Sequence, residues 1–539
     1  MRSLLPRPGW TGYRVTKGAA GVAGVVPALA VVLSLTSLTA CSTSSAPPPV
    51  TPAGATAAAA SQPVSPVSVV PQDSWADAVL YFVILDRFAD GDPRNDAGAD
   101  RNAKGTFHGG DIAGLRQQLD EIADLGATAI WITPVVKNID GFVTGAGFPD
   151  WGYHGYWADD FYSLDPRFGT EAELKGLVDD AHRRGIKVLL DVVYNHAGYD
   201  SVYTKDPKFK GWMRTESQGT CGQDDLTSCV SGLPDFKTER PEVADYLLEA
   251  HLGLAQRVGL DGFRLDTVKH VDHPFWKEHR KRTRERLGPG FFLVGEVWGG
   301  DAQALDPWFS GDEMDAGFDF SFQGNVVAFL QGRGRTVAFD RYLKSRQERT
   351  RSGYLLSPYL SSHDVQGALS LLGGDRELFR LAALLEMTSW GMPMIYYGEE
   401  VGRAGGDWPD NRSDMPWGDR KIQPGAGDRR DEALRADYKK LIAIRRAHPA
   451  LSRGTHEGLA TDGDLLVFLR RDAASGDAVL VAVNRGAQPA TASVPAPSEW
   501  GTGEVEDAWS GERPPRAGER IELTVAPRQA RILVGGGKP

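Results

Sequence analysis

Four short segments, each at the end of an apolar run, constrain this chain more than any other feature. They read DVVYNH at 191–196, GFRLD at 262–266, VGEVW at 294–298 and SSHD at 361–364. Each places acids, a guanidinium or imidazoles directly after residues typical of a buried strand. Catalytic groups emerge in this way from the carboxyl ends of the strands of a parallel barrel. The four segments therefore predict a catalytic barrel.

Apolar, strand-like runs alternate with amphipathic helical stretches from about residue 78 onward. The expected strands are 79–85, 129–133, 188–193, 262–265, 291–294, 316–320, 359–360 and 394–397. Helices are expected at 111–125 and 171–184, the second with acids at its start and bases at its end. This series predicts an α/β fold, a (β/α)8 TIM barrel formed by 75–196 and 236–448. A doubly wound open sheet is the alternative, but its glycine-rich phosphate turn is missing.

Two regions depart from this alternation. Residues 197–235 are polar, irregular and longer than an ordinary connection, which predicts an inserted domain after the third strand. From about residue 449 the helical period disappears, and short β runs at 465–469, 478–483 and 531–534 are separated by turn residues. Residues 449–539 are therefore expected to form an antiparallel β-sandwich.

The first seventy residues have the pattern of an export leader followed by a tether. Basic residues precede an apolar run at 19–40, which ends in Leu-Thr-Ala before Cys41. This ending looks like the lipobox of bacterial lipoproteins, which predicts a signal peptide at 1–40, a lipid on Cys41 and a tether at 41–74. An uncleaved membrane helix is the alternative. We expect export and attachment to the outer membrane or cell surface.

Charge and cysteine content narrow the possible partners. Acidic residues outnumber basic ones by 71 to 60, and no basic stripe is present, which argues against a nucleic-acid partner. Cys221 and Cys229 lie close together in a polar segment, and an exported domain can keep such a pair oxidised. A disulfide is predicted, with two free thiols as the alternative. No histidine or further cysteine at ligand spacing supports a metal site there.

The strand-end residues suggest a specific chemistry. Side chains alternate along 262–266, so Arg264 and Asp266 point to the barrel interior, where an aspartate can act as nucleophile. Glu296 follows an apolar lead-in and is expected to keep its proton and act as a general acid. Retaining cleavage of glycosides uses such a pair, with the carboxyl groups about five to six ångströms apart. A third acid, Asp364, could stabilise developing positive charge; structural ion pairs are the alternative reading of each acid alone.

Together these segments resemble glycoside hydrolase family 13, the α-amylase family, over about residues 75–535. The four strand-end segments are similar to its four signatures, and 153–157, 232–235 and 391–399 to three auxiliary ones. The resemblance implies that Asp266 is the nucleophile, Glu296 the acid/base and Asp364 the transition-state stabiliser. It also implies substrate contacts, with Lys269 and His270 on the leaving-group side. The implied substrate-binding residues are His154, Tyr156, Trp157, His196, Arg264, Lys269, His270 and His363.

Calcium is the metal that the resemblance implies. One candidate set, where the insertion meets the barrel, is Asn195, Asp235 and a carbonyl near His270. A second resembles a calcium loop of some family members, and an Asx-rich surface turn is the alternative for it. Its residues are Asp90, Asp92, Asn95, Asp96, Gly109 and Asp111.

Two positions depart from the family pattern. Ser362 stands where asparagine is usual before His-Asp, and Trp408 where aspartate is expected before proline. Asp407 or Asp410 could substitute for that aspartate, or Trp408 could add a stacking surface for substrate.

The function expected from these residues is an endo-acting α-amylase that cleaves α-1,4 bonds of starch, glycogen or maltodextrins, as a monomer. A glucanotransferase is one alternative. A cyclomaltodextrinase is another, although the N-terminal domain common in that group does not fit after so short a tether. A non-catalytic glycan-binding lipoprotein is the third, and the three intact acids argue against it.

Overall fold

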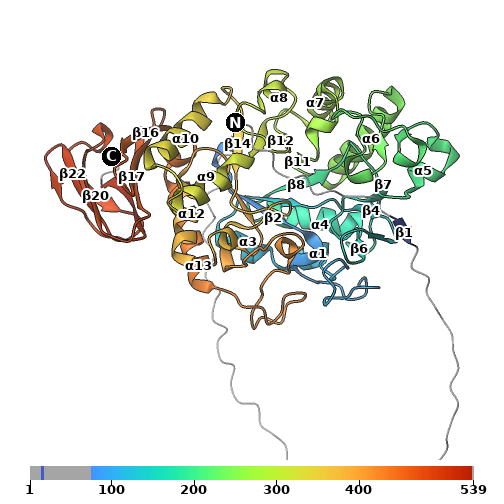
Figure 1. The fold of residues 1–539 in the computed structure, drawn as a ribbon, viewed down its shortest axis with the longest axis horizontal. Coiled ribbons are helices and arrows are strands. Elements are labelled where there is room, and N and C mark those ends of the chain that lie inside the picture. The colour runs from blue at the N-terminus through green and yellow to red at the C-terminus, as the bar shows by residue number, and fades with distance from the viewer. Residues whose placement is uncertain (1–13, 17–74, 537–539) are drawn as a thin grey trace, which may run out of the picture. The chain divides into compact units, whose positions relative to one another are not determined.

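The computed structural model describes residues 14–16 and 75–536. Its centre is a sheet of eight parallel strands in the order β14-β13-β12-β11-β8-β3-β2-β15. A parallel bridge between Tyr359 and Met394 joins its two ends, so the sheet closes into the predicted barrel (Figure 1). The strands are β2 (Leu80–Val83), β3 (Ala129–Ile132), β8 (Lys187–Val192), β11 (Gly262–Leu265), β12 (Phe292–Gly295), β13 (Ala316–Asp319), β14 (Leu355–Pro358) and β15 (Met394–Tyr396).

The seventh strand does not lie where the sequence pattern placed it. It was expected at 359–360, but β14 is formed by Leu355–Pro358, which pair with Ala316–Asp319 of β13. The polar Ser357 and the following proline disguise this strand, because proline is usually confined to strand edges and ends. Here Pro358 is the last residue of the strand, and Ser357 Oγ donates to the Met392 carbonyl at 2.8 Å.

The helices between the strands follow local signals in the sequence. Thr170 and Glu173 form a reciprocal capping box at the start of α4 (Glu171–His182). The helix expected at 111–125 is two helices, α2 (Ile112–Gln117) and α3 (Leu119–Leu125), separated by Gln118. The other main barrel helices are α6 (Pro241–Val258), α7 (His273–Leu287), α9 (Phe320–Leu330), α10 (Thr336–Arg349), α12 (Arg376–Thr388) and α13 (Glu432–Ala447).

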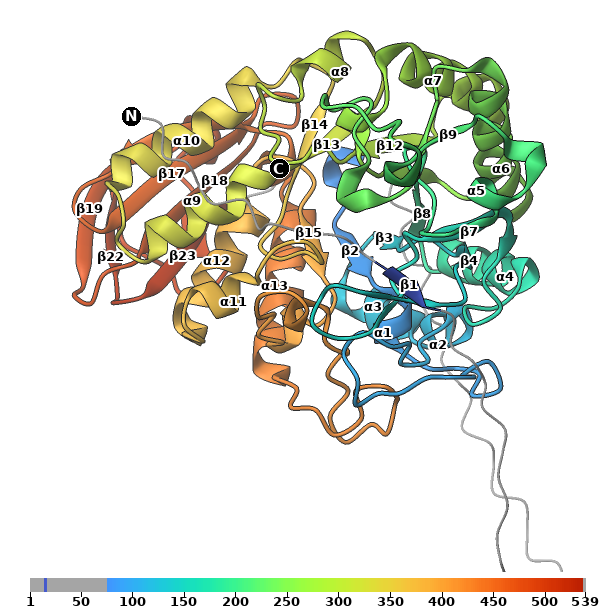
Figure 2. The same cartoon turned by 45° about the vertical axis from the view of Figure 1, so that its right-hand side comes forward.

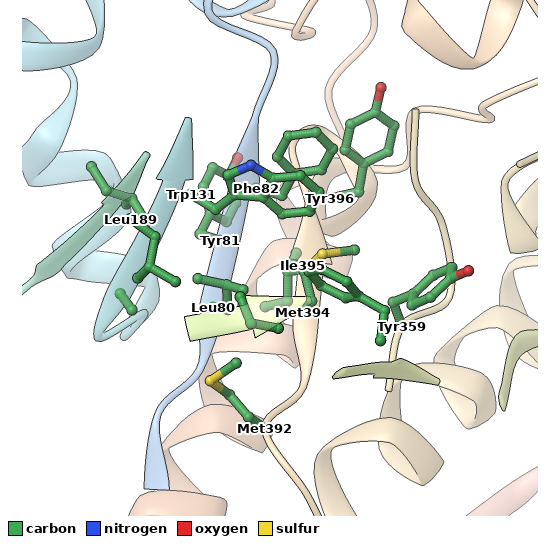
Figure 3. Close-up of a cluster of buried hydrophobic side chains, with 14 of the residues drawn as sticks. Leu80, Tyr81, Phe82, Trp131, Leu189, Tyr359, Met392, Met394, Ile395 and Tyr396 are labelled. Atoms are coloured by element: carbon green, nitrogen blue, oxygen red, sulfur yellow. The ribbon is translucent and has the colours of Figure 1, made fainter. Parts of the chain in front are cut away.

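Aromatic rings from neighbouring strands fill part of the barrel interior. Phe82 and Trp131 stack with their ring centroids 3.5 Å apart, and Tyr396 lies on the other side of Phe82 at 5.1 Å. Figure 3 shows these rings above a layer of aliphatic side chains that includes Leu80, Ile395 and Met394. Burying one such side chain contributes about 2 kcal/mol. This filled interior is a rigid floor under the carboxyl ends of the strands.

Residues 197–235 lie between β8 and α6 and contain little regular structure. A short antiparallel pair, β9 (Met213–Arg214) and β10 (Asp235–Phe236), and the helix α5 (Val202–Lys205) are its main elements. Cys221 and Cys229 form a disulfide with their Cα atoms 5.5 Å apart, which confirms the predicted pairing.

The C-terminal part is antiparallel, as predicted. One sheet has the order β16-β17-β18-β23-β20 and the other β19-β22-β21 (Figure 2). Apolar side chains from both sheets form one buried cluster. The strands are β16 (Thr455–Ala460), β17 (Leu465–Asp472), β18 (Asp477–Asn484), β19 (Ala490–Pro495), β20 (Glu504–Asp507), β21 (Arg516–Ala517), β22 (Arg520–Val525) and β23 (Gln529–Gly536). His456 of β16 meets Asp340 of α10 at 2.8 Å, which ties this sandwich to the barrel.

Almost all of the predicted leader and tether lies outside the described residues. Arg14–Thr16 form the strand β1, which pairs antiparallel with β5 (Phe142–Thr144). Within the described ranges, we find no helix with the length and apolar character needed to cross a bilayer.

Candidate active site

Asp266 and Glu296 are the first residues after two neighbouring strands. β11 and β12 pair in parallel with Leu265 opposite Gly295, so the next residue on each strand is one of the two acids. The Glu296 amide donates to the Leu265 carbonyl at 2.9 Å, which continues the pairing to the acids themselves. The two carboxyl groups therefore emerge side by side at the carboxyl edge of the sheet.

A single buried guanidinium joins the acids. Arg264 lies opposite Asp191 of β8, and its Nη1 is 2.9 Å from Asp191 Oδ1. The same nitrogen is 2.6 Å from Asp266 Oδ1, and Nη2 is 3.4 Å from Glu296 Oε2. The carboxyl groups of Asp266 and Glu296 thus converge on one side chain instead of turning toward the outer helices.

The environment of Glu296 holds its proton near neutral pH. Burial raises the pKa of Glu296 to about 8, and the negative charges of Asp266 and Asp364 add to this effect, while Arg264 opposes it. At pH 7 most molecules therefore carry a protonated Glu296. A carboxylic acid in this state can donate a proton to a departing oxygen.

Thr267 holds both acids from the turn that follows β11. Its backbone amide donates to Glu296 Oε2 at 2.8 Å, and its hydroxyl donates to Asp266 Oδ2 at 3.1 Å. Thr267 has φ 47°, a strained conformation for a β-branched residue. This strained turn orients the two carboxyl groups relative to each other.

Asp364 approaches the same site after β14. Its carboxyl group is 3.3 Å from both His363 Nε2 and Arg412 Nη2, and its side chain is 26% exposed. The departure at Ser362 has a local consequence, because the Ser362 hydroxyl accepts the backbone N–H of Asp364 at 3.2 Å. The serine thus positions the residue two places after it.

Neutral histidines and a tyrosine form one wall. The Tyr156 hydroxyl donates to Asp191 at 2.6 Å and lies 2.8 Å from His363 Nε2, so His363 donates to the tyrosine oxygen. Burial lowers the pKa values of His154, His196 and His363, and nearby arginines lower that of His363 further. These imidazoles are uncharged donors and acceptors, which suits contacts to sugar hydroxyls.

The remaining predicted substrate contacts occupy different surroundings. Trp157 is buried in a small apolar cluster, and its ring packs edge-on against the ring of His154. It therefore supports the position of that histidine. Lys269 and His270 lie in the short helix η5 (Val268–His270), directly after the turn at Thr267. His270 is partly buried, and its Nδ1 is 2.7 Å from the backbone carbonyl of Asp225 in the insertion.

The loop with the second departure carries residues that the sequence interpretation did not assign. Arg412 donates to the His363 carbonyl at 2.8 Å as well as contacting Asp364, and Asn411 donates to the same carbonyl. Asp410 pairs with Lys104 instead of facing these residues. The sequence interpretation considered segment 407–412 only for its missing aspartate. Arg412 belongs to this segment, but its contacts with His363 and Asp364 depend on how the loop folds.

Trp408 has an aromatic partner from another part of the chain. Its ring stacks on Phe148, with ring centroids 5.4 Å apart and planes 25° from parallel. Asp407 accepts the Trp408 backbone N–H. Of the alternatives for this departure, the aromatic surface is the one that the contacts favour. A second large aromatic, Trp298, follows Glu296 by two residues and is 52% exposed.

In the first candidate calcium set, Asn195 lies between the His270 carbonyl and Asp235. The side-chain amide of Asn195 lies 3.0 Å from both the His270 carbonyl and Asp235 Oδ1, so its nitrogen donates to both in one orientation of the amide and its oxygen faces both in the other. The other oxygen of Asp235 accepts from Arg214 at 2.8 Å. A calcium ion at this set stays a prediction, with the positive charge of Arg214 already beside Asp235.

The second set contains oxygens without partners. The Oδ1 atoms of Asp90, Asn95 and Asp96 are buried and accept no hydrogen bond, whereas the Oδ2 atoms of Asp90 and Asp96 lie 2.7 and 3.5 Å from Arg101 Nη2. Burial, with the charge of Asp90 next, raises the pKa of Asp96 to about 6. A Cβ on Gly109 would lie 2.4 Å from Asp96 Oδ1, so the glycine permits this approach. Crowded buried oxygens of this kind fit a hard cation.

The other two members of the second set have different contacts. Asp111 caps α2 through the Gly114 amide and accepts three further N–H donors from the 91–95 loop, which it thereby shapes. Asp92 turns its carboxyl group outward to Arg94. Within the described residues, no three side chains of His, Cys, Asp or Glu lie together in a way that could hold a metal ion. The second set therefore needs the amide oxygen of Asn95 as its third side-chain ligand.

Comparison with known proteins agrees with this geometry. Residues 82–417 match the model of the α-amylase catalytic domain, and 459–532 match the C-terminal domain of maltogenic amylases. Neopullulanase 2 of Thermoactinomyces vulgaris is 33% identical over 87% of this chain and 80% of its own length. A cyclomaltodextrinase from a Bacillus species is 32% identical over 77% and 74% of the two chains.

A solved structure shows the same fold. The α-amylase of Geobacillus thermoleovorans, in complex with acarbose, aligns with a TM-score of 0.74 at 29% identity, covering 86% of this chain and all of that one. The family match spans more than half of the chain and includes all three clustered acids. The chain is therefore a member of the α-amylase family of glycoside hydrolases, an α-glucan hydrolase with a maltogenic-amylase type C-terminal domain.

Proposed function

We propose that this protein hydrolyses α-1,4-glucosidic bonds of short and cyclic maltodextrins with retention of configuration. The observation that carries the proposal is the convergence of Asp266 and Glu296 on Arg264, with the pKa of Glu296 raised to about 8. The similarity to a neopullulanase and to cyclomaltodextrinases supports cyclodextrin-type substrates over the starch expected of an endo-acting α-amylase.

The proposed reaction uses the two acids in turn. Asp266 Oδ attacks the anomeric carbon while Glu296 gives its proton to the departing glycosidic oxygen, which forms a covalent glycosyl ester and breaks the sugar–oxygen bond. Glu296, now a carboxylate, takes a proton from water, whose oxygen attacks the same carbon and releases Asp266. Asp364 lies beside His363 and Arg412, where its carboxylate can stabilise positive charge on the sugar ring.

Two aromatic surfaces support the proposed substrate length, one exposed at Trp298 and one half-buried at Phe148 and Trp408. Trp298 extends the site beyond Glu296, and the stacked pair of Phe148 and Trp408 lies next to the Asn411–Arg412 contacts with His363. An acceptor sugar stacked near Glu296 would compete with water for the covalent intermediate. A glucanotransferase activity is therefore the second candidate, and appearance of oligosaccharides longer than the substrate would reveal it.

The test compares γ-cyclodextrin, maltoheptaose and soluble starch as substrates for the wild type. We expect kcat/KM to be at least about tenfold higher for the two short substrates than for starch, measured by reducing-sugar release. Asp266→Asn and Glu296→Gln should lose activity on all three substrates. Asp301 is an exposed acid that follows β12, as Glu296 does, and Asp301→Asn should retain activity. Preference for starch would reject the proposed substrate class, and activity in Asp266→Asn would reject the nucleophile.

We also propose one structural calcium ion, held by Asp90, Asn95 and Asp96. The support is their three buried oxygens without hydrogen-bond partners, together with the space left by Gly109. Arg101 pairs with the other oxygens of Asp90 and Asp96, and the ion would add positive charge at the three oxygens that have no partner. It takes no part in the reaction proposed above.

The N-terminal sequence supports a proposal about location. We propose that the protein is exported as a monomer and anchored to the cell envelope through a lipid on Cys41, at the end of the apolar run. In cells, Cys41→Ala should move the activity from the membrane fraction to the soluble fraction. Membrane retention of this variant would instead support an uncleaved helix.

A further inference from the structure

The disulfide in the insertion closes a small loop with its own internal hydrogen bonds. Cys221 and Cys229 are joined, and within the loop the Gly222 amide donates to the Thr227 carbonyl at 2.8 Å. The Asp224 carboxyl group accepts the backbone N–H groups of Leu226 and Thr227 at 3.0 and 2.9 Å. The tip at Asp225 and Leu226 is therefore held in one conformation.

This tip contacts the barrel at a predicted substrate residue. The Asp225 carbonyl lies 2.7 Å from His270 Nδ1. A carbonyl oxygen only accepts hydrogen bonds, so Nδ1 must carry the proton and Nε2 must present a lone pair. Among the described residues no hydrogen-bond partner of Nε2 is present, so this nitrogen is available as an acceptor for an external hydroxyl group.

His270 ends the short helix η5, which follows the turn between Asp266 and Val268. It lies four residues after Asp266, and the negative charge of Asp266 acts on its ring. Leu226, beside the carbonyl that holds the histidine, is 45% exposed, which is unusual for a large apolar side chain. A polar acceptor and an apolar surface next to each other match the alternating hydroxyl and C–H faces of a glucose unit.

We propose that the disulfide-closed loop 221–229 is a positioning element for the leaving-group side of the substrate. The Asp225 carbonyl fixes the ring of His270 so that Nε2 accepts a hydroxyl of the glucose unit beyond the cleaved bond, and Leu226 covers that unit. This inference rests on the proposed hydrolysis of maltodextrins. It makes Asp225 a positioning residue, and it gives the disulfide a role in substrate binding in addition to the stability of the insertion.

The proposal predicts different effects on substrates that have a sugar as leaving group and on substrates that do not. Maltotetraose places glucose units on the leaving-group side, whereas α-maltosyl fluoride leaves as fluoride and has no sugar there. Loosening the loop should therefore raise KM for maltotetraose and leave turnover of the fluoride unchanged. A loop that only stabilises the insertion would affect both substrates together.

The experiment uses the full-length protein with Cys221→Ser and Cys229→Ser combined. We expect kcat/KM for maltotetraose to fall about tenfold, mainly through KM, with α-maltosyl fluoride hydrolysis within about twofold of wild type. Wild type treated with a thiol reductant should behave in the same way. Gln218→Ser, an exposed change in the same insertion outside the disulfide loop, is the matched control and should leave both substrates unaffected.

A mutant cycle with His270→Ala completes the test. If the loop acts through the histidine, adding the two serines to His270→Ala should cause little further loss. Equal losses for both substrates, additive losses in the cycle, or no change on removing the disulfide would each overturn the inference. If the wild type turned over neither substrate, the proposed hydrolysis itself would fail, which is a distinguishable result.

Discussion

Arg264 Nη1 lies 2.6 Å from Asp266 Oδ1, two residues further along the chain and inside a barrel that buries the whole guanidinium. This pair is also linked to Asp191, so the arginine balances several buried carboxyl groups. Removing one partner from such a group leaves charge without compensation in a region with little water.

We therefore expect Arg264→Ala to lower the free energy of unfolding by about 3–5 kcal/mol and to abolish hydrolysis. Urea denaturation and reducing-sugar release are the measurements. Arg257→Ala, which breaks an exposed pair with Glu171, should change stability by less than about 1 kcal/mol. A stable Arg264→Ala protein would show that the carboxyl groups do not depend on this guanidinium.

The pH dependence should reflect the acid role of Glu296. Because burial and the neighbouring acids raise its pKa to about 8, the active protonated form is present at neutral pH and is lost as the pH rises through that value. We expect kcat/KM for maltodextrins to fall tenfold per pH unit above about 8. The decline should be weaker with α-maltosyl fluoride, whose departing group needs less protonation. If kcat/KM already fell with rising pH below pH 6, Glu296 would not be the general acid.

Calcium removal should destabilise the protein without a direct effect on the reacting groups. Bound at about 100 times its dissociation constant, the ion would contribute about 2.7 kcal/mol, so chelation should lower the Tm by about 5 °C. Asp96→Ala should abolish the difference between calcium and chelator in calorimetry. Asp92→Ala, whose carboxyl group faces Arg94 at the surface, should retain it. A Tm unaffected by chelator would remove the proposed ion.

Trp408 should influence the length of the products. Its stacking on Phe148 places an aromatic surface beside the loop that carries Arg412, so Trp408→Ala should change the distribution of cleaved bonds in maltoheptaose. We expect the total rate to fall less than about tenfold, because the acids are not touched. Chromatography of early products is the measurement.

Tyr162→Ala is the control for that change, since Tyr162 also packs on another ring, that of Tyr246, with the ring centroids 4.8 Å apart. It should leave the product pattern as in wild type. An unchanged pattern in Trp408→Ala would mean that the stacked pair stays outside the occupied part of the site.

The sequence by itself determined the barrel and the acids that approach one another. Alternating strands and helices are local patterns, and parallel strands all end at the same edge, so Asp266, Glu296 and Asp364 could be assigned to one site before any coordinates. The disulfide followed from two cysteines eight residues apart. The seventh strand was misplaced because Ser357 and Pro358 contradict the strand preferences on which that expectation depended.

Tertiary structure alone decided the contacts made by loops and the state of the buried groups. The raised pKa of Glu296 depends on burial and on charges that belong to other strands, and Arg412 reaches His363 across 49 residues of sequence. Likewise, Trp408 meets Phe148, and the Asp225 carbonyl meets His270, only when separate loops fold against each other. Such contacts join residues far apart in the chain, and no local propensity encodes them.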